Sequence, residues 1–325
     1  MGKLKNHYFF ADCPHKEPPG EWAALLRENG FSCFFDAGIY PGGGMFFLER
    51  ALGAQMRYVD DLRDTFHAYC EPLVESPSQL GAHFAHWEQS PAWLEYFGRV
   101  CAYASEAGGH LPLVAPHFYP LDAACALMGA LRFFELLADD REGALYMLEC
   151  VTELYLGMVR AIRKTGLALV NPFGFPGGAA GDLNAINISP ALLYELVYPL
   201  YARAAAELGG LFLGISPFDE DTMRNAAAAP GFTGLSFDAR IPFETIDRLL
   251  GGRMFVMHNY VFLDEHGPAE CVGGIYVNPI VASHSRDIEG AWRALSGHHD
   301  MCLYIQRHTF EEIKSTKERL MNNTI

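Results

Sequence analysis

The chain has 325 residues, of which half are hydrophobic and 13% are aromatic, and its formal net charge is −15. This composition provides for a large apolar core and excludes a disordered chain. The strong negative charge argues against general binding to nucleic acid or to an anionic membrane surface.

The eight cysteines are scattered along the chain and form no CxxC pair, which is typical of reduced thiols buried in a cytoplasmic protein. The N-terminal stretch lacks the apolar segment of a signal peptide. No apolar run reaches the roughly 18 residues that a membrane span requires. We therefore expect a cytoplasmic protein without a membrane-spanning segment.

Short apolar runs bounded by turn residues predict strands along the whole chain. Most are continuous rather than alternating, as expected for strands covered on both faces. In chain order they lie at Phe31–Asp36, Leu111–Ala115, Leu167–Asn171, Leu211–Ile215, Gly234–Phe237, Met254–Met257, Gly273–Val277 and Leu303–Gln306.

Helical patterns fill most of the intervals between these strands. Residues 45–108 are predicted to be helical with interruptions near Ser76-Pro77 and Ser90-Pro91, and the latter is typical of a helix start with proline in the first turn. A second helical region covers residues 121–164 and breaks at Asp139-Asp140. A third helix runs from Ser189 to Gly209.

Strands that alternate with helices of ten or more residues predict a parallel sheet. The number of strands, roughly eight, favours a single (β/α)8 barrel, with helical insertions after the first strands and one domain over residues 1–325. A doubly wound open sheet is the alternative. We find no linker, internal repeat or low-complexity segment that divides the chain.

The stretch 181–240 adds a resemblance to a known family. An Asp-containing loop precedes a Ser-Pro helix that carries Tyr198-Pro199, and the next two strands end in Gly214-Ile215-Ser216-Pro217 and in Asp238. This order resembles the uroporphyrinogen decarboxylase superfamily, and more closely its methylcobamide methyltransferase-like branch. The resemblance is clearest over residues 110–265 and implies a barrel fold and a methyltransferase that works with a corrinoid-carrying partner.

Two departures from the family pattern bear on the chemistry. The family's zinc-binding His-x-Cys pair falls on Gly214 and Ser216, and neither is a good zinc ligand. The Arg-rich motif of the decarboxylases is missing from the N-terminal glycine loop, which argues against decarboxylation of uroporphyrinogen. A relocated metal site using His258, His284 and an acid stays open as an alternative.

In parallel α/β folds the chemistry lies on the loops that follow the strands. This rule, together with the resemblance, gives four candidate catalytic residues: Asp182, Asp238, His258 and His117. Side chains in the same loops are candidates for substrate binding: Asp36, Tyr40, Tyr119, Phe175, Ser216, Asn259 and Arg240.

Each candidate also has a purely structural interpretation. Asp182 suits a turn cap before the Ser189 helix, Asp238 suits an ion pair with Arg240, and the histidines suit ordinary rim positions. Three functions therefore stay open: methyl transfer with a corrinoid protein or a small methyl donor or acceptor, a lyase or decarboxylase acting on a small organic acid, and a binding barrel without catalysis. The resemblance implies cobamide on a partner protein as a cofactor, and it also implies zinc, for which the family's ligand pair is missing here.

Overall fold

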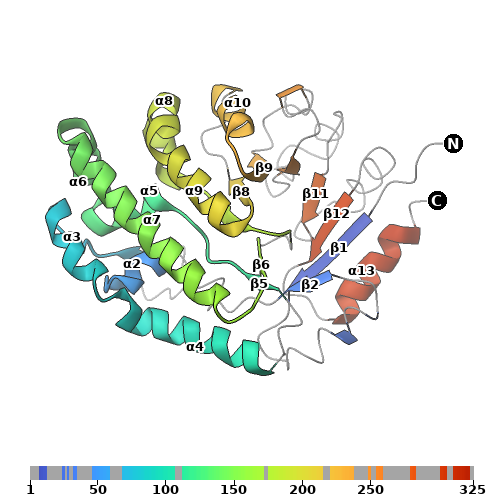
Figure 1. The fold of residues 1–325 in the computed structure, drawn as a ribbon. Helices are drawn as coiled ribbons and strands as arrows, with labels where there is room; N and C mark the ends of the chain where they lie inside the picture. The colour runs from blue at the N-terminus through green and yellow to red at the C-terminus, as the bar shows by residue number, and fades with distance from the viewer. Residues whose placement is uncertain are drawn as a thin grey trace.

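The computed structural model describes the parts of the chain that build most of the sheet and the helices around it (Figure 1). Long helices lie on the outside of the strands, and the N-terminal half contributes most of the helical layer. The described residues are 7–12, 24–25, 28, 32–34, 46–58, 68–106, 112–171, 175–214, 220–237, 248–249, 254–258, 279–282, 301–305 and 310–322.

Eight strands form one sheet, and all of its pairs are parallel. The strand order is β2-β1-β12-β11-β10-β9-β8-β7, so the first strand pairs with the last and the chain then steps to the next neighbour. This singly wound order contradicts the doubly wound alternative, in which the order reverses. The strands are β1 (His7–Asp12), β2 (Ser32–Phe34), β7 (Gly178–Ala180), β8 (Leu211–Gly214), β9 (Phe232–Phe237), β10 (Phe255–His258), β11 (Pro279–Ala282) and β12 (Met301–Ile305).

A second parallel pair, β5 (Leu113–Val114) and β6 (Leu169–Val170), adjoins the β7 edge of this sheet. A bridge between Phe118 and Ala180 joins the segment after β5 to β7. Among the described residues no pairing connects β2 to β5. Strand order and direction agree with the predicted (β/α)8 barrel, whereas closure of the ring goes beyond the described pairings.

The predicted helical insertion lies between β2 and β5. It contains α2 (Phe47–Ala51), α3 (Pro77–Phe84), a short 3-10 turn η2 (Trp87–Gln89) and α4 (Pro91–Glu106). The prediction of Ser90-Pro91 as a helix start is confirmed, because the Ser90 hydroxyl accepts a hydrogen bond of 3.2 Å from the Trp93 amide.

One part of this region was predicted wrongly as helix. An antiparallel hairpin of β3 (Met56–Tyr58) and β4 (Ala68–Cys70) interrupts it. Gly53 ends α2 with a φ of +99°, which a residue with a side chain rarely adopts. After that turn, an ion pair of 2.7 Å between Arg57 and Glu71 links the two arms of the hairpin.

The helical region 121–164 breaks at Asp140, as predicted, and also at Gly129. It forms α5 (Pro120–Met128), α6 (Ala130–Asp139) and α7 (Arg141–Arg163). Asp140 caps α7, since its carboxylate accepts a hydrogen bond of 3.0 Å from the Gly143 amide.

The helix predicted from Ser189 to Gly209 is present but is not uniform. It runs through α8 (Pro190–Leu192), a π-helical turn η4 (Leu193–Val197) and α9 (Tyr198–Leu208). Pro199 has no amide hydrogen to offer to the preceding turn, which accounts for the widened turn just before it. The remaining elements are the 3-10 turn η3 (Leu183–Asn187), α10 (Glu220–Ala228) and α13 (Phe310–Asn322).

The glycine-rich segment before Asp182 was predicted as a loop, but its last residues form strand β7. Its glycines allow the backbone to approach β8 closely. A Cβ atom on Gly177 would lie 2.4 Å from the carbonyl oxygen of Gly210, and the φ of Gly177 is +119°. The small residues are therefore a requirement of packing, and they conceal the strand from a pattern based on bulky side chains.

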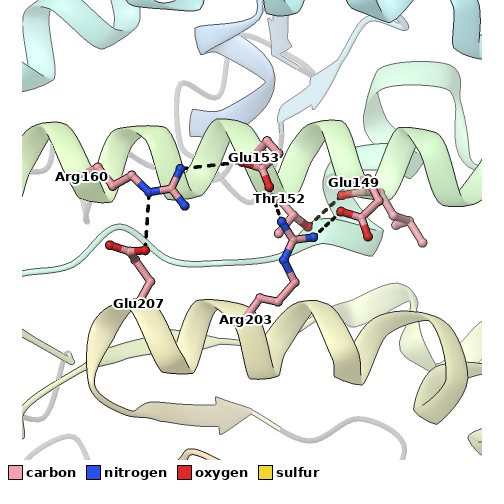
Figure 2. A network of polar contacts seen from close by, with 7 residues as sticks. Glu149, Thr152, Glu153, Arg160, Arg203 and Glu207 are labelled. Atoms are coloured by element: carbon pink, nitrogen blue, oxygen red, sulfur yellow. Dashed lines mark hydrogen bonds and ion pairs between the residues drawn. The ribbon is translucent and has the colours of Figure 1, made fainter.

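Charged side chains join α7 to α9 (Figure 2). Arg203 forms ion pairs with both Glu149 and Glu153, and Arg160 lies 3.4 Å from Glu207. All these side chains are partly exposed, so each pair contributes little alone. Together they hold the helix that follows η3 against the helix that precedes β6.

Candidate functional site

The segment after β5 meets the end of β7 through a parallel bridge between Phe118 and Ala180. The amide of Phe118 donates to the carbonyl of Ala179 at 2.9 Å, and the amide of Gly181 donates to the carbonyl of Phe118 at 3.1 Å. The hydroxyl of Tyr155, on α7, donates to the carbonyl of Pro116 at 3.0 Å. These bonds bring His117, in the loop after β5, beside Gly181 and Asp182, in the loop after β7. Both loops were predicted to carry site residues.

His117 presents an exposed imidazole at this point. Its Nε2 lies 3.3 Å from the carbonyl oxygen of Gly181. A carbonyl oxygen only accepts, so Nε2 carries the hydrogen and Nδ1 keeps its lone pair. Within the described part of the chain no protein group engages Nδ1.

The surroundings of His117 favour a neutral ring. Loss of solvation by the protein atoms around the ring lowers the pKa of His117, although the bond to Gly181 and the charge of Asp122 act in the other direction. A neutral imidazole with a fixed tautomer and one available nitrogen can act as a general base.

Asp182 is buried, with 3% of its surface exposed. Its Oδ1 accepts from the amide of Asp122 at 2.7 Å, and its Oδ2 accepts from the hydroxyl of Tyr201. Burial raises the pKa of Asp182, and the charge of Asp122 raises it further, whereas the hydrogen bonds from Tyr201 and the α5 backbone oppose the shift. Both carboxylate oxygens of Asp182 are bonded inside the protein, so the residue fixes the conformation of its loop.

Asp122 returns the same interaction. Its carboxylate accepts from the amides of Leu183 and Asn184, each at 2.7 Å, and from the side-chain amide of Asn184 at 2.9 Å. Asp182 thus caps α5 while Asp122 caps η3. The structural interpretation of Asp182 as a turn cap therefore applies to a helix about 60 residues away, not to the Ser189 helix, which Ser189 caps itself.

Glu49 on α2 belongs to this region and was not among the sequence candidates. It is fully buried, and its Oε2 accepts from the hydroxyl of Tyr119 at 3.1 Å. Burial raises the pKa of Glu49 from 4.5 to about 7. The signal in the sequence was a lone acid in an apolar helix, FLERALG, but nothing local shows that this face is the buried one.

Tyr119 and Phe175, two predicted substrate-binding residues, have different environments. Tyr119 is buried at 8% exposure, and its hydroxyl also accepts from the amide of Leu48 at 3.1 Å. Phe175 is half-buried, and its backbone pairs with Asn171. Phe118 beside them is fully buried. Among these described aromatic residues, Phe175 is the one that stays partly exposed.

The other candidates stay predictions. His258 is the last residue of β10, so it stands at a strand end as predicted. Convergence of His258, Asp182 and Asp238 on one cavity stays a prediction. The residues that lie outside the described ranges are Asp36, Tyr40, Ser216, Asp238, Arg240, Asn259 and His284.

The donor set does not fit the zinc site of the family that the sequence resembles. Gly214 ends β8 in the position of the histidine ligand and has no side-chain donor. Within the described residues, no three His, Cys, Asp or Glu side chains gather closely enough to hold a metal ion. The buried thiols of Cys70 and Cys125 are poor substitutes, since burial raises the pKa of both.

The sequence matches no family model and no curated protein. Solved structures do resemble it. A methyltransferase from Methanosarcina mazei aligns with a TM-score of 0.62 at 15% identity, covering 92% of this chain and 82% of that one. The homocysteine methyltransferase MmuM from Escherichia coli, in its oxidized form, covers 96% of both chains at 11% identity, but its TM-score of 0.41 supports no inference.

The first comparison therefore shows that the chain shares its fold with a methyltransferase. None of the described helices is long and apolar enough to cross a membrane. The fold alone does not specify a reaction, which has to be argued from the side chains at the strand ends.

Proposed function

We propose that this protein is a cytoplasmic methyltransferase of the uroporphyrinogen decarboxylase-like type, in which His117 is the general base that activates the methyl acceptor. The observation that carries the proposal is the fixed tautomer of His117, with Nε2 bonded to Gly181 and Nδ1 available at the carboxyl ends of β5 and β7. The shared fold with the M. mazei methyltransferase supports it. Closure of the ring between β2 and β5 into a (β/α)8 barrel is part of the proposal.

The reaction that suits this base is transfer of a methyl group to a thiol or hydroxyl. Nδ1 of His117 takes the proton of the acceptor S–H or O–H, while the acceptor sulfur or oxygen forms a bond to the methyl carbon. The bond between that carbon and its donor breaks, and its electron pair leaves with the donor. We propose a methylated corrinoid on a partner protein as the donor, with another small methylated molecule as the alternative.

Neighbouring residues hold the base in its reactive form. Gly181 fixes the tautomer of His117, and the bonds between Asp182 and Asp122 fix the loop that carries Gly181. No step passes through zinc, because Gly214 cannot supply the ligand that thiol activation by a metal would need. The net charge of −15 favours neutral or cationic acceptors over polycarboxylates.

The test uses methylcobalamin as the donor probe with a panel of simple thiols and phenols. We expect methyl transfer by the natural protein and a loss of about 10²- to 10⁴-fold in His117→Gln. The melting temperature and the circular dichroism of the variant should stay unchanged. Transfer at the normal rate by His117→Gln would overturn the assignment of the base, and binding of methylcobalamin with no transfer to any acceptor would favour the binding barrel.

A further inference from the structure

Tyr119 connects the buried Glu49 to the exposed His117. Its hydroxyl accepts from the Leu48 amide at 3.1 Å and donates to Glu49 Oε2 at 3.1 Å, so both ends of the phenol dipole are fixed. Its ring stacks on the imidazole of His117, with a centroid separation of 5.9 Å and an interplanar angle of 22°. Stacked rings in this range attract one another and define each other's planes.

Glu49 is an energetically unfavourable residue at this position. It is fully buried on a helix whose neighbouring residues Phe47, Leu48 and Ala51 are apolar and buried as well. Within the described residues its Oε1 has no hydrogen-bond partner, and no ion pair given there involves this carboxylate. A buried acid without a cation usually destabilises a fold, which makes Glu49 a candidate for a role other than stability.

The groups that face Glu49 indicate what this role is. Tyr119 is its hydrogen-bond partner, Asp122 opposes its ionisation through its charge, and Cys70 on β4 is electrostatically coupled to it. Tyr119 is the only one of these three that also touches the exposed histidine. Tyr119 is therefore the direct contact through which Glu49 can orient His117, whereas Asp122 acts on both groups through its charge.

We propose that Glu49 is a positioning residue for His117: it fixes the Tyr119 ring, against which the imidazole rests with Nδ1 available. The importance of this role for turnover rests on the proposed function, but the positioning itself does not. Glu49 and Tyr119 lie 70 residues apart in sequence, so the helical insertion contributes directly to the arrangement at the strand ends.

The positioning can be measured without an assay of turnover. Diethylpyrocarbonate acylates neutral imidazoles, and peptide mass spectrometry resolves His117 from the other 12 of the 13 histidines. The rate for His117 as a function of pH reports both its accessibility and its pKa. The variants are Glu49→Ala, Tyr119→Phe, their combination and the conservative Glu49→Gln, with Glu71→Gln as the control, since Glu71 is a neighbouring exposed acid that pairs with Arg57 instead.

Loss of one stacking contact corresponds to a change of about threefold to tenfold. We expect His117 to be acylated faster by that factor in Glu49→Ala and in Tyr119→Phe, with its pKa shifted upward toward the ordinary value. The combined variant should show no further increase, Glu49→Gln should restore most of the natural rate because its amide oxygen still accepts, and Glu71→Gln should match the natural protein.

Unchanged acylation of His117 in folded Tyr119→Phe would overturn the proposal, and so would an equal effect of Glu71→Gln. Phenylalanine keeps the volume of the ring, so this variant carries the test if Glu49→Ala does not fold. A changed acylation rate in a protein that transfers no methyl group would support the positioning and reject the proposed function. Methyl transfer by the natural protein together with an unchanged acylation rate of His117 in the variants would support the proposed function and reject the positioning.

Discussion

Asp122 and Asp182 cap each other's helices: the carboxylate of Asp182 accepts from the first turn of α5, and the carboxylate of Asp122 accepts from the first turn of η3. The two residues lie just after Phe118 and Ala180, which form a parallel bridge. Their exchange locks together the two loops that form the candidate site.

Removal of either cap should cost stability, and the two losses should not add. A lost cap costs about 1 kcal/mol, and partners in one network couple by about 0.5 to 3 kcal/mol. We expect Asp122→Ala and Asp182→Ala each to lower the free energy of unfolding in urea, and the combined variant to lose less than the sum. Asp139→Ala, an exposed acid at the end of α6, is the control. Strict additivity would show that the two caps act independently.

The buried Glu49 predicts a dependence of stability on pH. Its pKa is raised in the folded protein from 4.5 to about 7, so the folded state binds the proton more tightly than the unfolded state. The associated stability is fully present below pH 4.5 and is lost as the pH rises through 7.

Glu49→Gln removes this contribution. The difference in the free energy of unfolding between the variant and the natural protein should change by about 3 kcal/mol in favour of the variant as the pH rises from acidic to mildly alkaline. Urea unfolding of both proteins across this range measures the difference, since the other titrating groups are common to both. A difference that does not vary with pH would mean that Glu49 ionises normally in the fold.

The ion pairs between α7 and α9 should contribute modestly and be sensitive to salt. Arg203 lies between Glu149 and Glu153, so Arg203→Ala leaves two carboxylates close together. We expect a loss of about 1 kcal/mol at low ionic strength that shrinks as salt is added. Arg99→Ala, which breaks a single exposed pair with Glu95 within α4, should cost less. Equal losses would show that the network adds nothing beyond separate pairs.

Two glycines should respond to alanine in opposite ways. At Gly177 the φ of +119° and the contact of a Cβ with Gly210 both oppose a side chain, so Gly177→Ala should lower the melting temperature clearly. Gly98 lies in α4 with no heavy atom within 4 Å of its Cβ position. Gly98→Ala should raise the free energy of unfolding by up to about 1 kcal/mol. A stable Gly177→Ala would contradict the close approach of β7 and β8.

Local signals in the sequence predicted much of this fold. The Ser-Pro starts at Ser90 and Ser189 are present because capping depends on residues within one turn. Strand β7 was missed because Gly178–Ala180 carries no bulky side chain, and the reason for its small residues is a neighbour that arrives 30 residues later. The hairpin in the helical insertion was missed for a similar reason, since pairing across a turn is not a local property.

The candidate site, too, was predictable from the sequence only in part. The rule that loops after parallel strands meet predicted His117 and Asp182 as candidates, and their loops do lie together, while their catalytic roles stay predictions. The rule could not tell that Asp182 is used internally by Asp122 and Tyr201, nor that Glu49 supports Tyr119. Those partners are between 19 and 70 residues away, and no spacing in the sequence indicates them.

The most direct test of the account is the pH dependence of kcat/KM for methyl transfer from methylcobalamin to a phenol, an acceptor that titrates only near pH 10. A neutral His117 base with a lowered pKa predicts a rate that rises with pH to a midpoint below the ordinary histidine value of 6.5 and then stays level. The same rise should be missing in His117→Gln. A midpoint above 6.5, or an unchanged profile in the variant, would contradict His117 as the base.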